Sequence, residues 1–344
     1  MAAPSRLSYF DLYRGFGILL MVMGHTALFG QRFDHYIHAF HMPLFFLVSG
    51  YFAKPEKERK FLPFVAHIAQ TLLVPYLVFA IFLCQPLHYL YTHDFSLRYM
   101  LLSLVSSNHN RIDVAGAYWF LLCLFSCRVL FWGVMRFEHW WQRATIVALL
   151  SLAGLLECFR LPLCLDSAMS MLGVMYIGYI VKSYQKNRGV AWMMNAPWWC
   201  AASMVLAGGV LVMLNGPVII RCNHYARIWL FLPGCLLTLF GYLALARWLD
   251  SLKTRALRGI VWLLEYMGRN SIVFLVLNEV VIYASGLVLQ WMSVSPWLQR
   301  FGWGAPVQGM LNLVLTTCGL IVATEFFNRT WFRICLGKSL RRVN

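Results

Sequence analysis

The chain has 344 residues, of which 60% are hydrophobic and only 12% are charged, and its net charge is +16. A soluble domain carries about 25% charged residues, so this chain cannot cover itself with a wetted surface, and its natural solvent is a lipid bilayer. The positive residues stand in short segments between apolar runs rather than in a basic stripe with interleaved aromatic residues, which argues against nucleic acid as a partner.

The apolar runs are rich in Leu, Val, Phe, Ile and Ala and lack the alternation over about ten residues that barrel strands show. They predict an all-α fold, a polytopic transmembrane helix bundle of about ten spans in a single domain covering residues 1–344. A helical span needs about 20 mostly apolar residues. In chain order the predicted spans are 13–30, 36–53, 68–91, 116–135, 144–158, 167–181, 197–214, 226–247, 269–289 and 307–327.

The loops between these spans predict the orientation of the chain. If both termini are cytoplasmic, most of the 29 lysines and arginines fall in the inner segments. The excess of positive residues on the cytoplasmic side is the usual signal of orientation. Both termini are therefore predicted to be cytoplasmic. The basic residues left on the outer side are Arg32, Arg98, Arg111, Arg160, Arg221, Arg227 and Arg300.

Ionisable side chains stand at both ends of the first predicted span. Arg14 and His25 are 11 residues apart, which at about 100° per residue places both on one helix face, roughly 16 Å apart along the axis. Asp11 lies one turn before Arg14, on a neighbouring face. Such groups in a span are candidates for function, although a structural histidine and a snorkelling anchor are the alternatives for His25 and Arg14.

The second predicted span carries two further histidines, His38 and His41, which are three residues apart and could face the first span. Together with His35 they resemble metal-ligand spacing, but three such positions drift round a helix and Asp34 alone is a weak fourth ligand, so no metal is predicted. Pro43 is expected to free backbone groups and open a polar pocket. Ser49, followed by a glycine, is expected either to contact substrate or to let another helix approach closely.

Later spans hold fewer candidates. Asn278 and Glu279 lie in the middle of the ninth predicted span, where Glu279 is either a partner for an arginine or histidine or a neutral acid. Three ionisable residues precede the fourth span on the outer side and could contact an external substrate, unless they belong to a solvated loop: His109, Arg111 and Asp113.

The sequence from Phe10 to Gly15, with Arg14 ten spacers before His25, resembles the opening of acyltransferase family 3. The family motif F-F-x-x-S-G is matched by residues 45–50, and the longer match over residues 40–46 with Gly24-His25 resembles its fucose 4-O-acetylase-like branch. Later landmarks are matched by residues 118–121, which include Trp119, and by residues 268–272. The R-x-x-R pair that often leads into the third span is absent, since residues 67–70 read His-Ile-Ala-Gln, and Asn278-Glu279 replace a common later histidine.

This resemblance implies an O-acyltransferase of the bacterial cytoplasmic membrane, with no bound cofactor, that takes an acetyl, succinyl or other acyl group from cytoplasmic acyl-CoA, such as acetyl-CoA, and passes it to a glycan or lipid-linked saccharide. His25 would act as general base or transient acyl carrier, and Arg14 would hold a donor phosphate or carbonyl. The predicted substrate-binding residues are Asp11, His38, His41, Ser49, Trp119, Asn278 and Glu279.

Two other classes fit a ten-helix bundle. A saccharide transporter or flippase also needs a polar cavity at the membrane midplane, but it would be expected to show paired halves with broken helices, and no internal repeat is found. A purely structural membrane protein fits poorly with Arg14, His25 and Glu279 in apolar spans.

Overall fold

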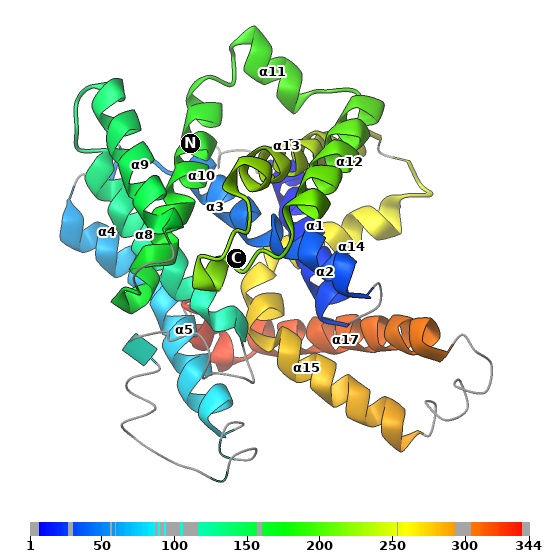
Figure 1. The fold of residues 1–344 in the computed structure, drawn as a ribbon. Coiled ribbons are helices and arrows are strands. Elements are labelled where there is room, and N and C mark those ends of the chain that lie inside the picture. The colour runs from blue at the N-terminus through cyan, green and yellow to red at the C-terminus, as the bar shows by residue number, and fades with distance from the viewer. Residues whose placement is uncertain are drawn as a thin grey trace. The chain divides into compact units, whose positions relative to one another are not determined.

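A computed structural model describes residues 7–26, 30–55, 57–58, 60–86, 116–156, 160–252, 254–292 and 304–338, together with positions 89, 93, 104 and 105. These residues form helices and contain no β-strand, only an isolated bridge between Ile219 and His224. The all-α prediction is therefore confirmed for the described part of the chain (Figure 1).

A helix lies in each of the ten predicted spans. The elements up to residue 134 are α1 (Ser8–His25), α2 (Gly30–His38), α3 (His41–Phe52), α4 (Phe61–Ile68), η1 (Ala69–Leu73), α5 (Val74–Phe79), η2 (Ala80–Cys84), η3 (Gly116–Tyr118) and α8 (Trp119–Val134). The remaining elements are α9 (Trp140–Leu155), η4 (Pro162–Cys164), α10 (Leu165–Ser183), α11 (Arg188–Met194), α12 (Trp198–Asn215), η5 (Ile220–Cys222), α13 (Ile228–Leu252), α14 (Arg258–Arg269), α15 (Ser271–Trp291), α17 (Gly304–Arg329) and η6 (Trp331–Leu336).

Six helical stretches within the described residues are long and apolar enough to cross a bilayer. They are Phe61–Leu83, Pro162–Ser183, Trp198–Asn215, Ile228–Leu252, Ser271–Trp291 and Val307–Arg329. The chain is thus a multi-pass membrane protein by length and composition, while the total of about ten spans stays a prediction. The remaining predicted spans correspond to α1, to α2 with α3, to α8 and to α9.

Contacts divide the chain into two compact units, each made of three separate segments. Unit 1 is Met1–Phe52, Ile177–Val218 and Tyr225–Ser271, and unit 2 is Ala53–Tyr176, Ile219–His224 and Ile272–Asn344. The prediction of one domain over residues 1–344 rests on the sequence.

Helix α1 is the centre of unit 1, where it packs against α2, α3, α13 and α14. Its buried face carries large side chains, among them Phe10, Tyr13 and Met21, which are inaccessible to solvent. Beside it, α12 and α13 form an antiparallel pair (Figure 1). Glycines let their backbones approach each other: a Cβ atom at Gly208 or Gly241 would overlap the facing helix, and one at Gly234 would crowd it.

Unit 2 collects the helices of the middle and the end of the chain. The bent stretch from α4 to η2 contains two π-helical segments, and η1 within it packs against α8. Helices α15 and α17 are joined through Ser285, whose hydroxyl contacts Asn312 and, at 2.8 Å, the hydroxyl of Thr316. Such interhelical hydrogen bonds between small polar residues are typical of packing in a membrane.

Candidate active site

A cluster of charged side chains stands at the first turns of α1. The Asp11 side chain is only 1% exposed, and its carboxylate lies 3.4 Å from the guanidinium of Arg14 and 3.4 Å from that of Arg269 at the end of α14. Arg269 also pairs with Glu265 one turn earlier. A buried carboxylate is costly unless it is paired, and the two arginines supply that pairing for Asp11 inside the unit.

Two glycines bring α1 and α14 close enough for these ion pairs. A Cβ atom on Gly15 would overlap the backbone carbonyl of Leu264, and one on Gly268 would overlap the backbone carbonyl of Asp11. The glycines therefore fix the separation of the two helices at the point where Asp11 meets Arg269.

Three imidazoles gather near the other end of α1. The ring of His25 lies 6.0 Å from the ring of His38, which in turn lies 5.4 Å from the ring of His41, both edge to face. His38 Nδ1 is 3.1 Å from the carboxylate of Asp34. The predicted approach of the second-span histidines to the first span is thus confirmed for His38, and Asp34 joins the group.

A break in the helix between Ala39 and Phe40 organises this cluster, so the second predicted span is not one continuous helix but α2 followed by α3. His38 Nδ1 donates to the carbonyl of Asp34 at 2.8 Å, and His41 Nδ1 donates to the carbonyl of Ile37 at 2.7 Å. Since a carbonyl can only accept, Nδ1 carries the proton in both rings, and the neutral form of each leaves Nε2 as the basic nitrogen.

The predicted effect of Pro43 is wrong. It is the third residue of α3, and the first turn of a helix has no intrahelical partner for its N–H groups, so Pro43 removes no hydrogen bond. The polar groups near His41 come instead from the break before α3.

The pKa of Asp34 is lowered from its ordinary value of 3.8. Burial acts in the opposite direction and raises the pKa, but the hydrogen bond from His38 and the nearby imidazoles outweigh burial.

Among the described residues, no group of three or more His, Cys, Asp or Glu side chains has the arrangement of a metal site.

The two clusters share α1 but lie at opposite ends of it. Arg14 and His25 are 11 residues apart, or about 16 Å at the helical rise. His25 is half-buried, and no residue in the described part of the chain hydrogen-bonds to its ring.

Ser49 lies in α3 and is half-buried. The close approach expected next to it occurs, but the small residue responsible is Gly178 of α10, where a Cβ atom would overlap the carbonyl of Leu47 and crowd the amide nitrogen of Tyr51. This contact fixes the position of the helix that carries His41.

The remaining predicted residues belong to unit 2. Trp119 begins α8, and its backbone carbonyl accepts a weak contact from the thiol of Cys164. Asn278 is fully buried in α15, and among the described residues neither its amide nitrogen nor its amide oxygen has a hydrogen-bond partner. Glu279, the next residue, is half-buried. The predicted loop residues His109, Arg111 and Asp113 lie outside the described residues.

Two members of the clusters were not among the predicted site residues, namely Arg269 and Asp34, which the sequence offered only as a weak metal ligand. Arg269 belongs to the matched motif over residues 268–272. It could have been found from that motif, because buried Asp11 needs a second cation as a partner. Asp34 lies four residues before His38, the spacing of facing residues on a helix, but the sequence assigns it to a loop before the second span.

These features define a class: a helical multi-pass membrane protein with ionisable side chains held inside a helical unit. The family model of acyltransferase 3, described as an acyltransferase domain, matches residues 7–325. The chain therefore belongs to acyltransferase family 3 and is a membrane acyltransferase. No curated protein and no solved structure matches the chain significantly.

Proposed function

We propose that the protein transfers an acyl group, such as acetyl, from cytoplasmic acyl-CoA to a hydroxyl group of an envelope or exported glycan in the bacterial inner membrane, with both chain termini cytoplasmic. The observation that carries this proposal is the chain of imidazoles from His25 through His38 to His41, with Asp34 at its side. It supplies a general base, which a sugar hydroxyl needs in order to attack a thioester.

His25 is the base in this proposal. It takes the proton of the glycan hydroxyl while the oxygen forms a bond to the acyl carbon and the carbon–sulfur bond breaks. The CoA thiolate leaves and receives the proton, so the products are the acylated glycan and free CoA. The contacts of the protonated Nδ1 of His38 with Asp34 hold the His38 ring in one orientation beside His25.

Arg14 has a different task, because it lies about 16 Å from His25 along α1. Asp11 orients its guanidinium from a buried position. A forked guanidinium binds a phosphate or polarises a carbonyl, so Arg14 holds the donor rather than the acceptor. Asn278, whose buried amide has no partner among the described residues, is kept as a substrate-binding candidate. His41, Ser49, Trp119 and Glu279 remain substrate-binding candidates.

The experiment measures release of free CoA from acetyl-CoA by the purified chain in nanodiscs, with and without added lipid-linked or polymeric glycan. His25→Ala should lower the glycan-dependent rate by about 10²–10⁴-fold, the usual contribution of a general base. His35→Ala is the matched control, since His35 lies on α2 but makes no described ring contact or hydrogen bond.

Mass spectrometry of the glycan should show the added acyl mass. If His25→Ala and Arg14→Ala variants that fold both keep near wild-type rates, the proposed roles are wrong. Movement of a saccharide across the membrane without consumption of the thioester would indicate a transporter instead.

A further inference from the structure

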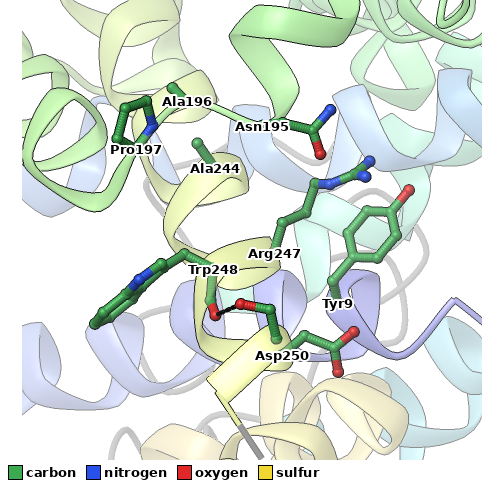
Figure 2. A pocket seen from close by; sticks show the side chains of 9 residues that line it. Tyr9, Asn195, Ala196, Pro197, Ala244, Arg247, Trp248 and Asp250 are labelled. Carbon is green, nitrogen blue, oxygen red and sulfur yellow. Dashed lines mark hydrogen bonds between the residues drawn. The ribbon is translucent and has the colours of Figure 1, made fainter.

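A cavity of about 460 Å³ opens in unit 1 at the end where α1 begins, α13 ends and α12 begins (Figure 2). Its size lies within the range of small-molecule sites, about 300–1,000 Å³. It is separate from the imidazole cluster, since Tyr9 and His25 are 16 residues apart on α1, about 24 Å at the helical rise. The lining residues with polar or aromatic side chains are Tyr9, Asn195, Arg247, Trp248, Asp250 and Ser251.

Arg247 gives this cavity a fixed positive charge. Its guanidinium lies over the ring of Tyr9, 4.6 Å from the centroid, and the side chain extends between Tyr9 and Asn195 (Figure 2). It donates no hydrogen bond to any residue of the described chain. The ring contact holds the group in place and leaves its five N–H donors for a ligand, and their planar fork matches the oxygens of a phosphate.

A second cation stands beside the first. Lys182 lies 5.0 Å above the ring of Tyr51, whose hydroxyl donates to Gln185 at 3.0 Å. Phe10 bridges the two aromatic rings, with centroid distances of 4.7 Å to Tyr9 and 4.3 Å to Tyr51. Both cations thus lie on one connected cluster of aromatic rings, which favours a ligand with more than one negative charge.

Asp250 adds an acceptor to the same cavity. The hydroxyl of Ser8 donates to both of its carboxylate oxygens, at 2.8 and 2.9 Å, which holds the group in place. A bare phosphate would gain nothing from a carboxylate. A nucleotide carries both phosphates for Arg247 and an amino group on its base that can donate to Asp250.

We propose that this cavity binds the phosphorylated adenine-nucleotide end of the acyl-CoA donor. The inference rests on the proposed function, and it assigns the donor's two ends to different places on α1. The phosphates of CoA stand at the opposite end of the molecule from its thioester. Binding of the nucleotide at Tyr9 and Arg247 therefore leaves the acyl end of the donor free to reach another part of α1.

The test uses the full chain in nanodiscs, adenosine 3′,5′-bisphosphate as the direct binding probe and acetyl-CoA as the donor. Arg247→Gln should weaken binding of the probe and raise the donor KM by about 10- to 100-fold, as expected for loss of a charge-assisted hydrogen bond, with kcat nearly unchanged. Arg188→Gln is the matched control, because Arg188 is exposed on the adjoining α11 and does not line the cavity.

A second measurement does not depend on the variant. Cross-linking of the wild-type chain with 8-azido-CoA should label peptides that contain Asn195 or Arg247. The proposal is overturned if the label appears only in peptides that contain neither Asn195 nor Arg247. It is also overturned if Arg247→Gln raises the KM no more than the Arg188→Gln control while transfer continues, a result that leaves the proposed function intact.

A phospholipid headgroup shares the phosphate chemistry. If short-chain phosphatidylglycerol displaces the probe and acetyl-CoA does not, the cavity binds lipid and the proposal is wrong. If the wild-type chain transfers no acyl group but binds the bisphosphate through Arg247, the nucleotide site stands and the proposed reaction fails.

Discussion

Replacing Gly268 by alanine should separate the two helices that hold the charged cluster. The added Cβ atom would overlap the carbonyl oxygen of Asp11, and the contacting atom belongs to a helix backbone, which cannot rotate away as a side chain can. To reach ordinary contact at 3.4–4 Å, α14 would have to move away from α1. A shift of about 1 Å is enough to take the 3.4 Å contact between Asp11 and Arg269 out of ion-pair range.

The cost has two parts. Overpacking at a helix interface costs about 1–3 kcal/mol. Loss of the ion pair adds at most about 1 kcal/mol, because the Arg269 side chain is 45% exposed and water screens the interaction. The sum, about 1–4 kcal/mol, should lower the thermal unfolding midpoint by several degrees. Because Asp11 orients Arg14, the transfer rate should fall further, by about 10²-fold, as expected for a misplacement of about 1 Å in an active site.

The assay compares Gly268→Ala with Gly259→Ala, both in α14. A Cβ atom at Gly259 meets no atom within 4 Å, so alanine there should be neutral or stabilise the helix by up to about 1 kcal/mol. Both variants are purified in the same detergent and heated at one rate, and release of CoA is measured at 25 °C. Equal stability and equal rates in the two variants would refute the reasoning that the glycine contact sets the helix spacing.

Two further predictions concern stability. Asn278→Leu should raise the unfolding midpoint, because it removes a fully buried amide that has no partner in the described chain, which costs about 1–3 kcal/mol. Thr324→Val is the control and should not raise the midpoint, because it removes a hydroxyl bonded to Leu320 at 2.7 Å. A lower midpoint for Asn278→Leu would contradict this prediction, and lower activity with higher stability would assign Asn278 to substrate binding. The lowered pKa of Asp34 means that its ionised form stabilises the fold above pH 3.8 and that this contribution is lost as the pH falls through the lowered value. Asp34→Asn should therefore reduce the acid sensitivity of the midpoint. Unchanged acid sensitivity would show that the contact between Asp34 and His38 adds nothing.

Composition, periodicity and motifs are enough to predict the class of fold and most of the candidate site. Low charge content and long apolar runs leave only helices in a bilayer, and a helix was found in each predicted range. Helical periodicity alone predicts that Arg14 and His25 lie on one face of the first helix. Their spacing and the motif at residues 45–50 indicated the family, which the match over residues 7–325 confirms.

The tertiary structure decided which side chains meet. The second predicted span looked continuous, because the residues around Ala39 and Phe40 are apolar and give no turn signal, yet the break there directs the Nδ1 atoms of His38 and His41 to backbone carbonyls. Arg269 reaches Asp11 across 258 positions of sequence only because two glycines let α1 and α14 touch. Periodicity records the neighbours of a residue along its own helix, whereas contacts between distant helices depend on backbone distances that only the packed structure contains.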